Sequence, residues 1–277
     1  MSTTGVMTST GATLEVPGAR LHYELRGAGS LAVLVGAPMD AAAFAPLAES
    51  LATDHTVLTT DPRGIHRSQV DNPEADSTPE LRADDLSALI AHVGAGPAVV
   101  FGSSGGAVTA LALVQAHPEQ VHTVIAHEPP LDELLEDREQ QRARTEDCCE
   151  TYLAGDVVGA WTKFLDQANI AIPAEVVEQM FGGERVAQVV TDERFWFAHE
   201  LRPSTWWRPD LAALRSVPSR IVVGLGADST GQACDHTSRA LASALDTEPT
   251  MFPGGHTGFV DAPDVFAHRL RSVLNGS

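Results

Sequence analysis

The sequence predicts an α/β protein in which a mostly parallel, doubly wound sheet carries an inserted helical cap. Short apolar runs rich in β-branched residues alternate with helical patterns along most of the chain. The runs are continuously apolar, which is typical of strands buried on both faces of a parallel sheet. One long stretch contains helical patterns alone, and we interpret it as the cap.

The expected strands begin with a leading hairpin over residues 12–25. The core strands are expected at 31–36, 56–61, 98–103, 121–128, 220–226 and 248–255. Helical patterns cover 41–52, 79–93, 106–118, 231–245 and 264–274. A strand, then a helix, then the next strand is the repeating unit of a doubly wound sheet.

The alternation stops between residues 131 and 207. A charged helical segment there is followed by the aromatic-rich "ERFWFAHELRPSTWW", and the next strand pattern comes only at 220. So short a stretch without strands of its own favours a cap over an independent domain. We therefore expect a core formed by 1–130 and 208–277, with the cap at 131–207. Open α/β sheets bind ligands at the carboxyl ends of their strands, and we place the cap there.

The charge balance excludes several classes of partner. The chain has 37 acidic and 18 basic residues and a formal net charge of −19. Nucleic acids and anionic membrane surfaces both require clustered Lys and Arg, so neither is an expected partner. The three cysteines and the histidines show no metal-ligand spacing, and we expect neither a metal nor a cofactor.

The location and the assembly are less constrained by the sequence. No apolar run approaches the length that spans a bilayer, and the first dozen residues lack the features of a signal peptide. We expect a cytoplasmic protein that acts on a small-molecule substrate. A homodimer is left open.

The segment "GSSGG" at 102–106 predicts a nucleophile. It fits the pattern G-x-S-x-G with Ser104 at its centre, and it follows an expected strand and precedes an expected helix. That context is the strand-to-helix elbow which exposes a serine hydroxyl above a sheet. We therefore predict that Ser104 is a nucleophile at the positive end of the helix dipole.

A neutral serine needs a base, and that base needs an orienting acid. His256 follows the last expected strand, where hydrolases with this elbow place their histidine. Two acids are candidates: Glu128 ends the strand after the elbow helix, and Asp228 lies in the turn after 220–226. Asp228 lies one residue before the usual position of the acid, whereas Glu128 ends its strand directly and is followed by two prolines.

Four segments together resemble the α/β-hydrolases, and in particular the zearalenone lactonases. These segments are "GSSGG", "AHEPPLDELLED", "DPRGIHRS" and "GGHTGFVDAPDVFA", and the similarity extends over nearly the whole chain. In that family the acid is the glutamate of the His-Glu pair. The resemblance therefore implies a triad of Ser104, His256 and Glu128, with Asp228 as the fallback acid. We interpret the loop 61–64, "DPRG", as structural and fixed by Asp–Arg contacts.

An oxyanion hole should complete the site. The backbone N–H of Gly105 is one expected donor, since it follows the nucleophile. The second should come from the loop "VGAP" at 35–38, where alignment on the proline selects the N–H of Ala37 and leaves Gly36 as its rival. Main-chain donors of this kind stabilise the oxyanion by ~3 kcal/mol each.

These features predict a serine hydrolase that cleaves an ester or lactone through an acyl-enzyme. The aromatic cap indicates a medium-sized, largely apolar substrate, of which a zearalenone-type lactone is one example. The alternatives are a receptor-like α/β-hydrolase with little turnover and a hydrolase of carbon–carbon bonds. The side chains expected to line the substrate pocket are Pro38, Met39, Ser103, Pro129, Leu131, Trp196, Phe197, Trp206, Trp207 and Phe259.

Overall fold

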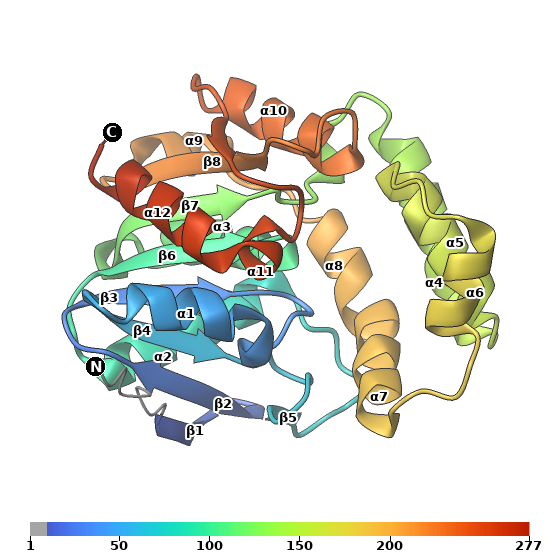
Figure 1. Ribbon diagram of the computed structural model, residues 1–277, viewed down its shortest axis with the longest axis horizontal. Coiled ribbons are helices and arrows are strands. Elements are labelled where there is room, and N and C mark those ends of the chain that lie inside the picture. Colours follow the sequence, from blue (N-terminus) through green and yellow to red (C-terminus); the bar gives the residue numbers. More distant parts are fainter. Residues whose placement is uncertain (1–9, 277) are drawn as a thin grey trace, which may run out of the picture.

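A computed structural model describes residues 10–276, and a nine-stranded sheet forms its centre (Figure 1). The strand order is β1-β2-β4-β3-β6-β7-β8-β9, with β5 paired to β2. From β4 to β9 along this order neighbouring strands are parallel, while β1, β2 and β5 pair antiparallel. The strands are β1 (Thr10–Val16), β2 (Ala19–Arg26), β3 (Ser30–Val35), β4 (His55–Thr60), β5 (Gln69–Val70), β6 (Ala98–Ser103), β7 (Val121–His127), β8 (Arg220–Gly226) and β9 (Thr250–Phe252).

Helices cover both faces of the sheet. One face carries α1 (Ala45–Leu51), α11 (Gly258–Asp261) and α12 (Pro263–Leu274), which lie in front in Figure 1. The other carries α2 (Pro79–Val93), α3 (Gly105–Ala116), α9 (Leu211–Ser216) and α10 (Ala233–Ala244). Each face has its own apolar cluster, so the central strands are buried on both sides, as their continuous apolarity predicted. The predicted fold class is confirmed.

The segment between β7 and β8 contains helices and no strand. After the short 3-10 helix η3 (Asp132–Leu134) it contains α4 (Arg138–Leu153), α5 (Val157–Ala168), α6 (Ala174–Phe181), α7 (Ala187–Phe195), the π-helix Trp196–Glu200 and α8 (Leu201–Thr205). In Figure 1, α4, α5 and α6 lie on the side towards which β6 and β7 point, and α8 lies between them and the sheet. We call residues 131–207 the cap; its exact bounds remain a prediction. None of the helices within residues 10–276 is long and apolar enough to cross a membrane.

The strand register brings three chain segments to one edge of the sheet. Ser103 pairs with His127, and His127 pairs with Gly224, across β6, β7 and β8. Residues that directly follow these positions therefore leave the sheet at the same level. Ser104 and Glu128 are two such residues, so both emerge at the edge beneath the cap.

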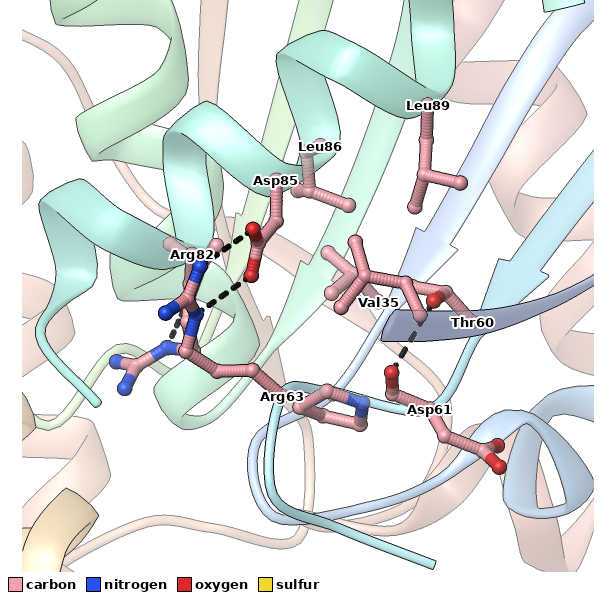
Figure 2. A pocket seen from close by; sticks show the side chains of 12 residues that line it. Val35, Thr60, Asp61, Arg63, Arg82, Asp85, Leu86 and Leu89 are labelled. Atoms are coloured by element: carbon pink, nitrogen blue, oxygen red, sulfur yellow. Dashed lines mark hydrogen bonds and ion pairs between the residues drawn. The ribbon is translucent and has the colours of Figure 1, made fainter. Parts of the chain in front are cut away.

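The loop after β4 is fixed by two Asp–Arg pairs, each made with a residue outside the "DPRG" segment. Arg63 makes a bidentate ion pair with Asp85 of α2, at 2.7 and 2.6 Å (Figure 2). Asp61 accepts from Arg67 Nε at 2.7 Å and from the Ala41 N–H at 2.9 Å. All of these contacts lie within the protein framework, and they favour the structural interpretation of this loop.

A buried arginine beside this loop ties the cap to the core. Arg82 on α2 donates to Thr109 Oγ1 of α3 at 2.9 Å and to Ser204 Oγ of α8 at 2.8 Å (Figure 2 shows Arg82 beside the Arg63–Asp85 pair). It also donates to the Ser77 carbonyl oxygen. Because a buried guanidinium needs its donors satisfied, these bonds hold α8 against α2 and α3.

Candidate active site

Ser104 lies between β6 and α3 in a backbone conformation that L-residues rarely adopt. Its φ is 57° and its ψ is −127°. Such a conformation costs ~1–3 kcal/mol and persists only where the surroundings impose it. A Cβ on Gly102 would collide with the Gly106 carbonyl, and one on Gly106 would collide with the carbonyl oxygen of Val35. The glycines of the G-x-S-x-G pattern are therefore required by close backbone packing at the turn.

Glu128 and His256 form a short hydrogen bond. His256 Nδ1 lies 2.6 Å from Glu128 Oε2, and the other carboxylate oxygen accepts from the Gly226 N–H at 2.8 Å. The carboxylate is fully buried, while the histidine side chain is 32% exposed. Glu128 also has a positive φ of 52°, so a second strained residue lies at this edge of the sheet.

The hydrogen bonds keep Glu128 ionised. Burial raises its pKa, but the bond from His256 and the neighbouring imidazoles outweigh burial and bring the pKa to about 2. The ionised carboxylate therefore accepts a hydrogen bond from the Nδ1–H of His256. This tautomer leaves the lone pair on Nε2, the nitrogen that a general base uses.

The preceding residue, His127, has a structural role. Its Nδ1 lies 3.2 Å from Ser103 Oγ, and its ring packs among Phe101, Phe252 and Phe266. Burial lowers its pKa to about 4, so the ring is neutral. Of the His-Glu pair, only the glutamate reaches the site.

The fallback acid lies away from the histidine. Asp228 is exposed, and its N–H donates to the Gly254 carbonyl at 3.0 Å. Within residues 10–276 its carboxylate makes no hydrogen bond to His256. The geometry therefore favours Glu128 over Asp228 as the acid.

The loop after β3 packs directly on the elbow. A Cβ on Gly105 would stand 2.6 Å from the Ala37 carbonyl oxygen, so Ala37 and Gly105 are in close contact. Gly105 is the first residue of α3, where the N–H has no acceptor within the helix. Gly36 contacts Gly106 in the same way. The residues predicted to supply the oxyanion donors thus lie beside Ser104, and their role as donors stays a prediction.

Comparison with known proteins identifies the fold family. Residues 30–159 match the family model of the α/β-hydrolase fold. The hydrolase YraK of Bacillus subtilis (strain 168) is 34% identical, over 97% of this chain and 97% of its own. The chain belongs to the α/β-hydrolase superfamily.

Two further proteins are similar to this α/β-hydrolase over most of its length. The zearalenone hydrolase of Bionectria ochroleuca is 27% identical, over 93% of this chain and 95% of its own. The solved structure of an N-acyl homoserine lactone degrading enzyme superposes with a TM-score of 0.69 at 19% identity. It covers 94% of this chain and 99% of that chain. At that identity the solved structure supports the fold alone.

A cavity of about 160 Å³ lies between the α/β-hydrolase core and its cap. Ser104, Glu128 and His256 form its wall on the sheet side. The cap contributes side chains from η3, α4, α5 and α8, and the start of α10 closes the remaining side. These lining residues are Pro130, Asp132, Thr145, Phe164, Gln167, Ala168, Ile170, Leu201, Thr205, Gln232, Ala233 and Cys234.

None of the ten pocket residues predicted from the sequence is among the residues that line this cavity. Three of them belong to the apolar core instead. Leu131 and Trp207 belong to the apolar cluster on the α3 face of the sheet. Phe259 stacks on Phe44 at 4.9 Å between ring centroids, in the cluster on the other face. Their size stabilises the core because large apolar side chains bury the most surface.

The three cap aromatics predicted to line the pocket also lie away from this cavity, and they pack against other residues of the cap. Trp196 and Phe197 pack inside the cap with Tyr152 and Cys149 of α4. Trp206 is half-buried beneath the Arg142 guanidinium, 5.6 Å from its ring centroid. Aromatic residues at this density hold the cap helices together.

The remaining four predicted pocket residues border the site without lining the cavity. Ser103 is fully buried and bonded to His127, and Pro129 is buried one residue before the lining Pro130. Pro38 and Met39 are half-buried in the loop after β3, where Met39 packs against the core. Apart from Ser104, Glu128 and His256, the residues that line the cavity were missed, because the sequence does not distinguish helix residues that face a cavity from those that face another helix.

Within residues 10–276, two clusters contain metal-ligating atoms that lie within 4.8 Å of one another. They are Glu128–Cys234–His256 and Asp40–Asp61–His66. In the first, the 2.6 Å bond between Nδ1 and Oε2 leaves no room for an ion, whose ligands each lie about 2 Å away. In the second, Arg67 already neutralises the Asp61 carboxylate. Hydrogen bonds and ion pairs therefore account for both clusters.

Proposed function

We propose that this α/β-hydrolase is a serine hydrolase that cleaves the ester or lactone bond of a neutral, largely apolar substrate. The observation that carries this proposal is the combination of residues in the wall of the cavity. It combines a serine at a strained elbow with an imidazole whose Nδ1 is bonded to a buried carboxylate. That combination is what activation of a serine hydroxyl requires.

The reaction starts when Ser104 Oγ attacks the acyl carbon of the substrate and His256 Nε2 takes the hydroxyl proton. The carbonyl oxygen becomes an oxyanion, towards which the N–H groups of Gly105 and Ala37 donate. Collapse of this intermediate breaks the ester bond, and His256 returns its proton to the leaving alkoxide. The acyl group then remains on Ser104.

Water completes the cycle by the same steps. His256 removes a proton from the water, which attacks the acyl carbon, and the acid product leaves as Ser104 regains its proton. Glu128 holds the imidazole in the required tautomer and stabilises its cationic form. In a lactone both products are parts of one molecule, so the ring opens to a hydroxy acid.

The cavity and the relatives both favour a lactone or ester of moderate size. Phe164, Ile170 and Leu201 supply apolar walls, and none of the lining residues within 10–276 is a lysine or arginine. An anionic substrate would therefore lack a countercharge. The zearalenone hydrolase among the relatives makes a zearalenone-type lactone the first candidate substrate.

The test is hydrolysis of a panel of p-nitrophenyl esters and lactones, including zearalenone, by the wild-type protein and by Ser104→Ala. We expect turnover and stoichiometric labelling by a fluorophosphonate, and we expect both to be lost in the variant. Since Ser104→Ala removes one oxygen beside the cavity, its unfolding transition should match that of the wild type. Residual activity above a few per cent in the variant, or hydrolysis of carbon–carbon bonds only, would contradict the proposal.

A further inference from the structure

Asp132 is a buried acid on the cap side of the cavity, four residues after Glu128. It begins the 3-10 helix η3, which packs against α4 and α10, and only 6% of its surface is exposed. It lines the same cavity as Ser104 and His256. The reaction steps described above make no use of it.

No partner within residues 10–276 satisfies this carboxyl group. Its neighbours along the chain are already engaged, since Glu133 pairs with Arg142 at 2.5 Å and Asp137 accepts from Gln141 at 2.8 Å. The Asp132 carboxyl group makes neither a hydrogen bond nor an ion pair with a described residue. Burial, with the charges of Asp137 and Glu133, raises its pKa to about 7.

Most other buried acids in this protein are paired. Asp85, Asp61 and Glu193 each bond to an arginine. A buried polar group without a partner costs ~1–3 kcal/mol, and such groups are rare unless they serve a function. At the wall of a substrate cavity, a bound ligand can supply the missing donor.

The cavity chemistry restricts what that donor can be. An anion is disfavoured because the lining residues in 10–276 include two carboxylates and no basic residue other than His256. An ammonium group would have to leave water for an apolar cavity, at a far higher cost than a hydroxyl. A hydroxyl group donates one hydrogen bond without a charge, and it suits both protonation states of the acid.

We infer that Asp132 binds a hydroxyl group of the substrate, so that the preferred substrates are neutral hydroxyl-bearing esters or lactones. This inference rests on the proposed function for its chemistry, while the binding itself does not require turnover. A site that hydrogen-bonds a substrate hydroxyl strongly rejects the analogue without it, because the buried polar group is then left unpaired.

Matched substrates test the inference. We would measure kcat and KM for p-nitrophenyl esters of linear alkanoic acids over several chain lengths, each beside its ω-hydroxy and ω-amino counterparts. At the chain length that reaches Asp132, the ω-hydroxy ester should show at least a tenfold higher kcat/KM than the plain ester. Asp132→Leu should abolish this ratio, and Asp132→Asn should retain part of it, because the amide oxygen still accepts a hydrogen bond.

The control is Glu136→Gln, which removes a charge at an exposed acid nearby and should leave the ratio unchanged. Equal kcat/KM values for plain and hydroxy esters at every length, or a preference for the ω-amino esters, would overturn the inference. Calorimetric binding of the same ligand pairs to Ser104→Ala separates it from the proposed function. If the wild-type protein cleaved no ester while binding still depended on the hydroxyl group, the role inferred for Asp132 would be supported and the proposed serine hydrolase function would be refuted.

Discussion

The Glu128 carboxylate receives two donors, one at each of its oxygens. Gly226 supplies a backbone N–H, and a Cβ at that position would stand 2.9 Å from the carboxylate oxygen, so glycine permits this approach. The remaining oxygen is bonded to His256. The contacts with Gly226 and His256 thus determine both the position and the ionisation of the Glu128 carboxylate.

Replacement of Glu128 by glutamine should show how much of the activity depends on the negative charge of this side chain rather than on its size. Glu128→Gln keeps the size of the side chain but removes the charge that stabilises the imidazolium and selects its tautomer. We expect kcat to fall by up to about 10⁴-fold, the loss that follows when a triad aspartate becomes asparagine. Steady-state kinetics on the best p-nitrophenyl ester would measure the loss.

Asp228→Asn provides the matched control, since it removes the other candidate charge from an exposed position. Its kcat should stay within about twofold of the wild-type value, as is usual for a surface residue away from the chemistry. A silent Glu128→Gln together with an inactive Asp228→Asn would reverse the assignment of the acid.

Individual site residues could be predicted from the sequence where they stand at defined positions in a motif. Ser104 follows from a strand–elbow–helix pattern, and His256 from its place after the last strand. Asp132 could not be predicted, because in "PPLDELLED" it looks like one of several solvated acids. Its burial depends in part on the contact of η3 with α10, a helix that is remote in sequence.

Among the elements, strands with a continuous apolar run were predicted almost to the residue. The run at 98–103 became β6 and the run at 220–226 became β8. The two-residue strand β5 was missed, since so short a strand has no periodicity. The last strand was predicted too long, at 248–255, because its pairing with β8 covers only Thr250–Phe252.

The cap helices could be recognised from the sequence, but their contacts could not. Periodicity identifies a helix with apolar residues, yet it does not reveal whether those residues face a cavity or another helix. Here the aromatic side chains face one another, as in the stacked pair of Trp161 and Phe181 at 4.3 Å. Phe164 is the one aromatic residue of the cap within 10–276 that lines the cavity, and the other cap residues that line it are not aromatic.

The segment from Ile170 to Val186 is the part of the cap with the most exposed connections. Gly182, Gly183 and Glu184 are all exposed between α6 and α7. Exposed loops of small and polar residues are preferred sites of proteolysis. We expect a glutamate-specific protease to cut after Glu184 before it cuts any bond within the sheet, as mass spectrometry of timed digests would show.

Occupation of the cavity should slow this cleavage, because Phe164 and Ile170 of the cap line it. Digestion before and after fluorophosphonate treatment tests the effect, with the untreated Ser104→Ala variant as the reference. First cuts within β6 or β7 would show that the cap is the better protected part.

For the whole molecule, a buried acid at the junction of cap and core links stability to pH. Glu200 is fully buried, and neither carboxylate oxygen has a hydrogen-bond partner within residues 10–276. Burial raises its pKa to about 7, against an opposing effect of Arg82. In the unfolded chain the same group loses its proton near pH 4.5.

Between those two values the folded state therefore holds a proton that the unfolded state has released. A rise in pH through this window favours unfolding, so Glu200 should lower the free energy of unfolding from pH 4.5 to 7. Urea unfolding of wild type and Glu200→Gln at pH 5 and pH 8 tests this. The variant should lose less stability than the wild type over that interval, and Glu136→Gln, at an exposed acid, should behave as the wild type.

The place of the cap in the chain has a consequence for synthesis on the ribosome. The cap interrupts the sheet between β7 and β8, so β6, β7 and the whole cap emerge before the strand that completes their edge. Until β8 and the loop of His256 are translated, Glu128 has neither of its two donors. A nascent chain stalled after the cap would thus carry an acid without its donors at the end of β7, and we expect the active-site edge of the sheet to form only after the last strands have been translated.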